Sequence, residues 1–523
     1  MRGVAVSTAA GARVGGSGPA PEAASATAAA ARAGAWLVAV ASAAGLLAAC
    51  GGGDADPGPG SLPAGLAFVI DDDGVPARGE LWLLPVGDTS DPATASPVRL
   101  DATIGTPGDV RQVEWSPDGG RIAALVGQGD APALVVYGVL PSTAPPTPTT
   151  IVDEAADMFG WDPAGRRLLH ADGERRLWVS DLTGGTTRLS DADAVSRVGT
   201  FGDYRPTWSP DGGGVGFKEK IGDGWTSHVV TLAGLGVTAD RTALWRLDRW
   251  TPSGAAMLGW TRADAVAEPA PVVLCLATGA ALPLPGPPDL EGFARFLSAD
   301  GRHLLVLLAG EVMVADVDGC AVTERARVSL AGAQVVSMPQ WTGDGRHAVW
   351  LARAPSGDGR VEVLDVEAPA TLRVITAPGV TQVRVHEPPP VGARVLWGEW
   401  RGGREHLMVS GDDARGGREV VAGVGGATTK VVWPSPDGQR VAYTTDTFEG
   451  EEALEVVDLG SGVRQVIHRG PTSAIAWAPD GRTLAFYADG PGDLFVTRDD
   501  GRGFALPRGL GDGRHAWSGS WSP

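Results

Sequence analysis

A short motif recurs along the chain at regular intervals and restricts the fold more than any other feature. Residues 115–119 read Trp-Ser-Pro-Asp-Gly, the string returns at 208–212, and close variants stand at 433–438 and 477–481. Weaker copies begin at residues 161, 250, 296 and 341, a degenerate copy lies at 387–392, and a last Trp-Ser-Pro begins at residue 521. The intervals from the first copy to the last average about 45 residues. The repeated positions are Trp115, Asp118, Gly119, Trp161, Trp208, Asp211, Gly212, Trp250, Trp341, Trp433, Asp437, Gly438, Trp477, Asp480, Gly481 and Trp521.

The sequence of each repeat predicts four short strands joined by turns. In Ser-Pro-Asp-Gly the proline pre-sets φ, the aspartate accepts local backbone hydrogen bonds and the glycine takes a positive φ, so the motif joins two antiparallel strands. Short apolar or alternating segments follow it, for example at 121–126, 177–181 and 186–189. A sheet this small cannot bury both faces alone, so neighbouring sheets must stack. The repeat therefore predicts an all-β β-propeller of four-stranded blades, with the repeated aromatic side chain as a wedge between blades.

The two ends of the repeat region complement one another. Residues 66–101 supply the second, third and fourth strands of a blade, and residues 515–523 supply a first strand without the rest. Pairing these segments would close a ring and remove both open edges. The units then number about ten, more than the usual four to eight blades. We expect one large ring, with two smaller rings as the alternative.

The composition supports a turn-rich fold and excludes some partners. The chain has 76 Gly and 40 Pro, and its 43 % hydrophobic residues suffice for a buried core. Its formal net charge is −19, which repels nucleic acid and anionic lipid surfaces. We therefore expect no nucleic-acid partner, and a monomer.

The repeats also resemble those of a known family. The Trp-Ser-Pro-Asp-Gly units with their trailing apolar strands are similar to the WD40-like (PD40) repeats of TolB-type β-propellers, over residues 65–523. The resemblance implies protein contacts in the cell envelope, where the TolB family works with an outer-membrane lipoprotein. The chain departs from TolB because no α/β domain stands between residue 64 and the first expected strand.

The first 64 residues are expected to target and anchor the chain and not to form part of the propeller. An apolar run of about 14 residues follows Arg32, which is the length of a signal peptide and too short for a membrane span. It ends in Leu-Ala-Ala-Cys at Cys50, which resembles the lipobox of bacterial lipoproteins. The resemblance implies a signal peptide at 1–49, a lipidated Cys50 and a flexible tether at 50–64, with Gly51 implying the outer membrane, facing the periplasm or the cell surface. The alternative is an ordinary secretory signal with a chance cysteine.

Two further cysteines, Cys275 and Cys320, fall in neighbouring repeats. They could form a single disulfide in an oxidising envelope, or remain two separately buried thiols. The second interpretation is favoured.

A search for catalytic motifs finds little. Gly-x-Ser-x-Gly, His-Glu-x-x-His, Cys-x-x-Cys and phosphate-binding Gly-Lys-Ser/Thr patterns do not occur in the sequence, so we expect no catalytic residues. His303 and His347 follow Asp-Gly-Arg in consecutive repeats and are weak metal candidates; the alternative is a position that tolerates a polar residue. Residues 71–74 and 316–319 resemble fragments of calcium loops without the terminal Glu. We expect no cofactor, with a weak calcium site as the alternative.

Three segments depart from the repeat and are the binding candidates, because the scaffold does not require them. The first is the connection 191–205, with Tyr204 and Arg205. The second is the segment 218–225, which holds two of the three lysines beside Trp225. The third is the segment 397–406. Its candidate residues are Trp400, Arg401 and His406. The alternative interpretation of each segment is a solvated loop.

The sequence thus favours an envelope lipoprotein that acts as a non-catalytic scaffold and binds a protein or a cell-wall or glycan partner. The alternative is a propeller-based polysaccharide lyase or hydrolase, which requires His303, His347, His386 or nearby carboxylates to converge within about 3–5 Å at the channel mouth. A purely structural role is a third interpretation.

Overall fold

The computed structural model describes residues of the range 65–521. The segments within this range that it does not describe are 71–78, 86–96, 102–108, 128–131, 139–147, 195–205, 223, 243, 262–269, 285–294, 299, 309, 368–370, 377–382, 387, 403, 412, 423–427, 447–451, 489–492, 500–502 and 506–515. The described part contains strands and turns and no α-helix.

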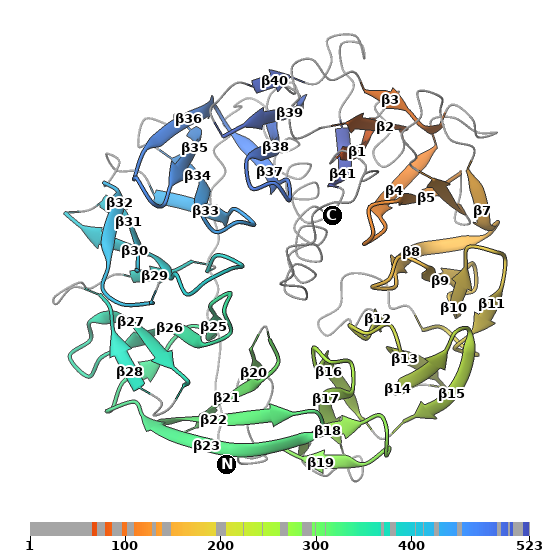
Figure 1. The fold of residues 1–523 in the computed structure, drawn as a ribbon, viewed down its shortest axis with the longest axis horizontal. Coiled ribbons are helices and arrows are strands. Elements are labelled where there is room, and N and C mark those ends of the chain that lie inside the picture. Colours follow the sequence, from red (N-terminus) through yellow and green to blue (C-terminus); the bar gives the residue numbers. More distant parts are fainter. Residues whose placement is uncertain are drawn as a thin grey trace, which may run out of the picture.

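Ten small antiparallel sheets follow one another around a single ring, which confirms the expected β-propeller of ten blades (Figure 1). Blades 1 to 5 consist of β41 (Ala516–Trp521), β1 (Gly65–Ile70), β2 (Glu80–Pro85) and β3 (Val98–Arg99); β4 (Val110–Trp115), β5 (Arg121–Val126), β6 (Ala133–Gly138) and β7 (Thr149–Val152); β8 (Ala155–Trp161), β9 (Arg167–Asp172), β10 (Leu177–Asp181) and β11 (Thr186–Arg188); β12 (Thr207–Trp208), β13 (Gly214–Ile221), β14 (Gly224–Ala233) and β15 (Gly236–Arg241); and β16 (Arg246–Trp250), β17 (Ala256–Thr261), β18 (Ala270–Cys275) and β19 (Ala281–Pro283). Blades 6 to 10 consist of β20 (Arg295–Leu297), β21 (His303–Leu308), β22 (Glu311–Asp318) and β23 (Ala321–Ser329); β24 (Gln334–Val335), β25 (Gln340–Trp341), β26 (His347–Arg353), β27 (Gly359–Asp365) and β28 (Thr371–Val374); β29 (Val383–Val385), β30 (Leu396–Arg401), β31 (Arg404–Val409) and β32 (Arg418–Val421); β33 (Thr428–Pro434), β34 (Arg440–Asp446), β35 (Glu452–Asp458) and β36 (Arg464–Arg469); and β37 (Thr472–Trp477), β38 (Thr483–Ala488), β39 (Asp493–Arg498) and β40 (Gly503–Ala505).

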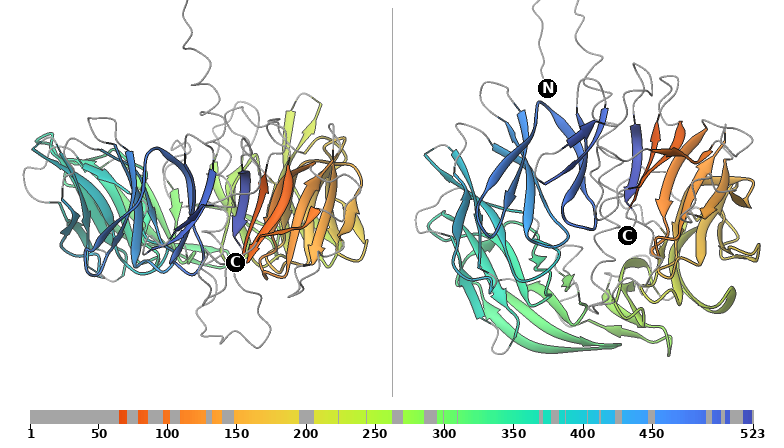
Figure 2. Two further views of the ribbon diagram at one scale, coloured as in Figure 1. Left: turned by 90° about the horizontal axis from the view of Figure 1, so that it is seen from above. Right: turned by 45° about the horizontal axis from the view of Figure 1, so that its top comes forward.

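The ring closes as the sequence predicts. In blade 1 the strand order is β3-β2-β1-β41, so three strands from the start of the repeat region pair with one from its end (Figures 1 and 2). The antiparallel register sets Leu66 opposite Trp521 and Phe68 opposite Gly519. This pairing removes the open edge that β1 would otherwise present.

The Ser-Pro-Asp-Gly turns are built by the same hydrogen bonds in several blades. Ser116 Oγ donates to Asp118 Oδ1 at 2.6 Å, and the N–H of Gly120 donates to the same oxygen at 3.0 Å. Gly119 takes a φ of 66°, which favours glycine because it has no Cβ. Turns of neighbouring blades also touch: a Cβ on Gly301, whose φ is 66°, would lie 2.1 Å from Cδ of Pro252 in the turn before it. The repeated glycine therefore serves both the turn and the packing of blades.

Substitution Gly301→Ala is expected to lower the free energy of unfolding by about 2–3 kcal/mol, because a strained φ is combined with a clash against a rigid proline ring. The matched control is Gly222→Ala, where φ is 62° and no atom lies within 4 Å of the added Cβ. The control should lose only about 1 kcal/mol. Urea denaturation of both variants measures the difference, and equal losses would contradict contact between the turns.

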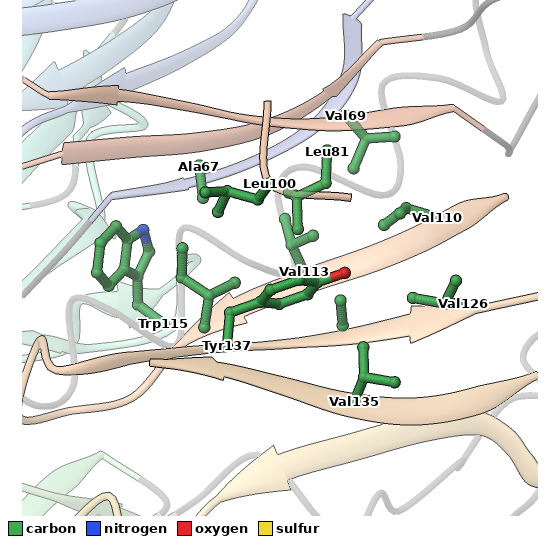
Figure 3. Close-up of a cluster of buried hydrophobic side chains, with 12 residues drawn as sticks. Ala67, Val69, Leu81, Leu100, Val110, Val113, Trp115, Val126, Val135 and Tyr137 are labelled. Carbon is green, nitrogen blue, oxygen red and sulfur yellow. The ribbon is translucent and has the colours of Figure 1, made fainter. Parts of the chain in front are cut away.

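The repeated tryptophans lie between blades. Trp115 belongs to a buried cluster that includes Ala67, Val69 and Leu81 of blade 1, and it lies at the Ala67 end of this cluster (Figure 3). The indole N–H also reaches the first strand of the preceding blade: Trp161 Nε1 donates to the carbonyl of Glu114 at 3.3 Å. The same bond recurs, within 3.4 Å, for Trp208 to Gly160, Trp250 to Thr207 and Trp477 to Trp433. Each wedge thus combines apolar burial with one hydrogen bond.

Trp433 does not occupy the wedge position, so this part of the repeat assignment is wrong. The inserted residue places Pro434 before the turn serine, and Trp433 takes the place that Glu114 has in blade 2. Its ring packs against the cluster shared with blade 10, which includes Ile475 and Phe486.

Cys275 and Cys320 form a disulfide, which corrects the favoured interpretation of two separate thiols. Their Cα atoms lie 5.4 Å apart, and 45 residues separate them in sequence. This separation is one repeat, so the two residues fall near the same end of adjacent blades, one at the end of β18 and one in the β22–β23 turn.

The double variant Cys275→Ser and Cys320→Ser is expected to lose about 2–4 kcal/mol of stability, because the closed loop constrains the unfolded chain. Reduction of the wild type should lower its melting temperature by a similar margin. The double variant itself should not respond to reductant, and a response would contradict the assignment of the effect to this bond.

Candidate functional site

The topology gives the ring two different faces. In an antiparallel meander, the turns that join first to second and third to fourth strands share one face, here named the turn face. The hairpins that join second to third strands, and the connections between blades, lie on the opposite face, here named the loop face. All three segments that depart from the repeat lie on the loop face: the connection from β11 to β12, the β13–β14 hairpin and the β30–β31 hairpin.

Among the second-to-third-strand hairpins that the structure describes, β13–β14 has the longest paired strands. Its strands have 8 and 10 residues, whereas β5 and β6 in blade 2 have 6 each. Strand register pairs Lys220 with Trp225 and Lys218 with Ser227, so these four side chains share one side of the sheet. Val229 continues this side and packs against blade 5. The indole of Trp225, near the end of this hairpin, is 43 % exposed.

The other side of the hairpin holds the first residues of the connection to β12 in place. Glu219 accepts hydrogen bonds from the N–H groups of Asp191 and Ala192, both at 2.6 Å. His228 Nε2 lies 3.3 Å from Glu219, and its Nδ1 lies 3.0 Å from Asp240. The start of the connection is therefore tied to blade 4. Tyr204 and Arg205 lie outside the described residues.

In blade 8 the structure brings Arg401 and His406 together but engages both in ion pairs. Arg401 contacts the buried carboxylate of Glu399, which also accepts the indole N–H of Trp397 at 2.8 Å. His406 Nδ1 lies 2.9 Å from Oε2 of Glu419.

Two further candidates from this blade are Trp400, on β30, and His386, which follows β29. Trp400 is partly exposed next to the hairpin tip, and His386 lies against Glu405 at 3.6 Å. The hairpin therefore offers Trp400 and the edge of Arg401 to solvent.

The turn face carries a pocket of about 550 Å³ between blades 6 and 7. His303 Nδ1 lies 3.1 Å from Asp316 Oδ1, and Arg325 contacts the same oxygen at 2.9 Å. Arg325 also reaches Glu367 of the next blade at 3.5 Å. Asp318, from the expected calcium-loop fragment, lines the pocket as well. The lining mixes arginines and carboxylates that are largely paired with one another.

His347 belongs to a different cluster from His303. Its ring lies 3.5 Å from Asp344 and 3.8 Å from Asp365, and Arg346 forms a two-point contact with Asp365 at 3.0 Å. Within the described ranges, no group of three or more His, Cys, Asp or Glu side chains has an arrangement that could hold a metal ion. The first calcium-loop fragment, 71–74, lies outside the described residues.

Asp365 links this cluster to the pH dependence of stability. Burial would raise its pKa, but the guanidinium of Arg346, the N–H of Glu367 and the charge of His347 outweigh burial and hold the pKa below its ordinary value. Because the pKa of Asp365 is lower in the folded than in the unfolded chain, its ionised carboxylate stabilises the folded state at pH values above the unfolded pKa of about 3.9. This contribution to stability is lost as the pH falls through the folded-state pKa.

Substitution Asp365→Asn is therefore expected to cost about 1–3 kcal/mol at pH 7. The difference from wild type should shrink as the pH is lowered from 7 through the depressed folded-state pKa of Asp365, because the wild-type carboxylate becomes protonated there. Asp413→Asn, at an exposed carboxylate 3.6 Å from Arg415, is the control and should change little at either pH. Thermal melts across this pH range provide the measurement, and a deficit that stays constant with pH would contradict the electrostatic origin.

Residues that the sequence did not single out complete the loop face beside Trp225. Trp245 precedes β16, is 43 % exposed, and its carbonyl accepts a hydrogen bond from Ser227 Oγ at 3.2 Å. Arg246 follows Trp245 and lies close enough to Lys218 for its positive charge to lower the pKa of the lysine. The sequence offered one indication of this site: Trp245 stands only five residues before the repeat residue Trp250 and so lies outside the repeat position.

Comparisons with known proteins concern the fold of the chain and do not identify its function. No family model and no curated protein matches the sequence. The chain is similar to a crystal structure of "the eukaryotic initiation factor", with 11 % identity and a TM-score of 0.50, over 88 % of this chain and 99 % of that one. It is also similar to the oligogalacturonate lyase of Vibrio parahaemolyticus, with 14 % identity and a TM-score of 0.35, over 55 % of this chain and 83 % of that one. For TolB of Acinetobacter baumannii the identity is 12 % and the TM-score 0.28, over 59 % of this chain and 82 % of that one. At such identities the likeness concerns the β-propeller fold alone.

The part of the chain that the structure describes contains no helix with the length and hydropathy of a membrane span.

Proposed function

We propose that the chain is a non-catalytic β-propeller scaffold that binds an envelope protein or glycan partner through its loop face. The observation that carries this proposal is the common location of the three departures from the repeat. The turn face is made largely of the repeated turns that hold neighbouring blades together, whereas the loop face carries the long hairpin with Trp225 and the hairpin with Trp400. Aromatic and arginine side chains are typical anchors of binding interfaces.

The proposal includes an anchor. Residues 1–49 act as a signal peptide, Cys50 is lipidated, and the tether 50–64 lets the monomeric propeller reach partners near the outer membrane. The lipobox supports this part of the proposal. Labelling cells with a fatty-acid analogue tests it: the wild type should incorporate label, and Cys50→Ala should not.

Site-specific photo-crosslinking in intact envelopes tests the binding surface. A photoreactive residue at Trp225 or Trp400 should yield discrete adducts, and the same residue at Thr278 or Ser461, in third-to-fourth-strand turns of the turn face, should not. Adducts only from the turn-face positions would contradict the proposal. Loss of adducts in the Cys50→Ala background would show that binding depends on the anchor.

A propeller enzyme is the second candidate, because the pocket between blades 6 and 7 places His303, Asp316 and Arg325 together. His347 and His386 do not line this pocket, so the histidine convergence that a metal-dependent lyase requires is not met among the described residues. Release of reducing sugar ends from wall or acidic polysaccharides by the purified protein, abolished in His303→Ala, would establish this function instead.

A further inference from the structure

The loop-face end of the β13–β14 hairpin carries cations that lack anionic partners. Within the described part of the chain, the side chains of Lys218, Lys220 and Arg246 make no hydrogen bond or ion pair. Some other arginines of the propeller are paired, such as Arg346, which forms a two-point contact with Asp365, whereas Arg302 and Arg482 likewise make no ion pair among the residues that the structure describes. Three cations gathered on adjacent strands without a described carboxylate partner are informative because acidic residues outnumber basic ones by 62 to 43 in this chain.

These cations are also close to one another. Lys218 lies on the side of blade 4 that faces blade 5, where Arg246 begins the first strand. Partial burial lowers the pKa of Lys218, and the positive charge of Arg246 lowers it further. Two like charges at a partly buried position cost free energy, which an incoming anion would recover.

Apolar side chains surround the cations. Trp225 shares the side of the hairpin that bears Lys218 and Lys220, and Trp245 lies next to it through the hydrogen bond from Ser227. Both indoles are 43 % exposed, and Ile221 at the hairpin tip is 56 % exposed. Indole surface beside unpaired cations suits a ligand that offers both apolar groups and carboxylates.

We propose that this surface, formed by Lys218, Lys220, Trp225, Trp245 and Arg246, is the docking site for an acidic protein segment with apolar anchors. Glutamate or aspartate side chains of the segment pair with the three cations, and its leucine or aromatic side chains pack on the two indoles. The inference deepens the proposed binding function of the loop face and rests on it. Charge complementarity identifies the partner, because the chain as a whole carries a net charge of −19 and so disfavours an acidic segment away from these cations.

A peptide of alternating Glu and Leu residues, labelled with a fluorophore, is the probe, and fluorescence anisotropy with the purified propeller is the measurement. The double variant Lys220→Gln and Arg246→Gln should bind the peptide about tenfold more weakly, and Trp225→Ala should show a similar loss. The matched control is Arg415→Gln with Arg482→Gln, two exposed arginines next to turn-face turns, which makes the same change in net charge. Binding should weaken as salt is raised.

Each result decides the inference. Equal peptide affinity of the two double variants would overturn it, as would equal binding of a Lys/Leu peptide. Binding of an anionic polysaccharide such as alginate to this surface, without binding of the Glu/Leu peptide, would also overturn it but leave the loop-face scaffold intact. Failure of the scaffold itself would appear separately, as crosslinks confined to the turn face.

Discussion

Removal of residues 516–523 is expected to abolish the cooperative unfolding transition of the intact ring. The truncation deletes β41, the first strand of blade 1, and leaves the edge of β1 that faced β41 without a partner, while β1 stays paired with β2. Ala67, Phe68 and Val69 on β1 are fully buried in the closed ring, so the deletion exposes core as well as an open edge. Each lost backbone hydrogen bond contributes about 0.5–1.5 kcal/mol, and the apolar exposure adds to that sum.

Differential scanning calorimetry and small-angle scattering test this expectation. The truncated chain should show a broad transition at lower temperature and a larger radius of gyration. Deletion of residues 51–57, which removes a similar number of residues from the expected tether, is the control and should leave the melting temperature unchanged. Equal melting temperatures for the two deletions would contradict a ring held by its terminal strands.

The second large effect is expected for Trp350→Ala, at one of the largest fully buried side chains. Trp350 packs with Leu305 and Val312 of blade 6, and its Nε1 donates to Oε2 of Glu362 at 2.8 Å. Glu362 is also fully buried, and Arg360 lies 2.5 Å from its other oxygen. The substitution creates a cavity and removes one partner of a buried carboxylate, at a cost of about 3–5 kcal/mol or more.

Two further variants separate the cost of the cavity from the cost of the lost hydrogen bond to Glu362. Trp350→Phe keeps most of the apolar volume but removes the N–H group, and it should cost about 1–3 kcal/mol. Trp225→Ala removes an equally large but half-exposed indole and should change stability by less than about 0.5 kcal/mol. Urea denaturation of the three variants gives the free energies. A loss at Trp350 no larger than the loss at Trp225 would show that blades 6 and 7 do not depend on this contact.

Much of the fold could be predicted because the repeat encodes it locally. Pro117, Asp118 and Gly119 specify a turn by their own backbone preferences, and the interval between turns sets the number of strands per blade. Closure of the ring could also be predicted, because the first segment lacked the strand that the last one supplied. The position of Trp433 was misjudged because a single inserted residue moves every later side chain to the opposite face of a strand.

The candidate site could be predicted only in part, because it depends on contacts between blades. Trp225 was found as an aromatic residue outside the repeat, but its neighbours Trp245 and Arg246 come from the next blade and lie near it only in the folded ring. The same reason explains the disulfide: two cysteines one repeat apart are brought together only when adjacent blades are superimposable. The conformational preferences of single residues carry no information on the contacts around Trp225 or on the disulfide.

The pairing of β1 with β41 has a consequence for biogenesis. The first blade cannot be completed until the polypeptide has been synthesised through residue 521, so its three early strands must wait for most of the chain to emerge. Such a high contact order slows folding and prolongs the exposure of an aggregation-prone strand during translation. A holding chaperone that keeps residues 65–100 from pairing with other chains would protect these strands until β41 displaces it and closes the ring.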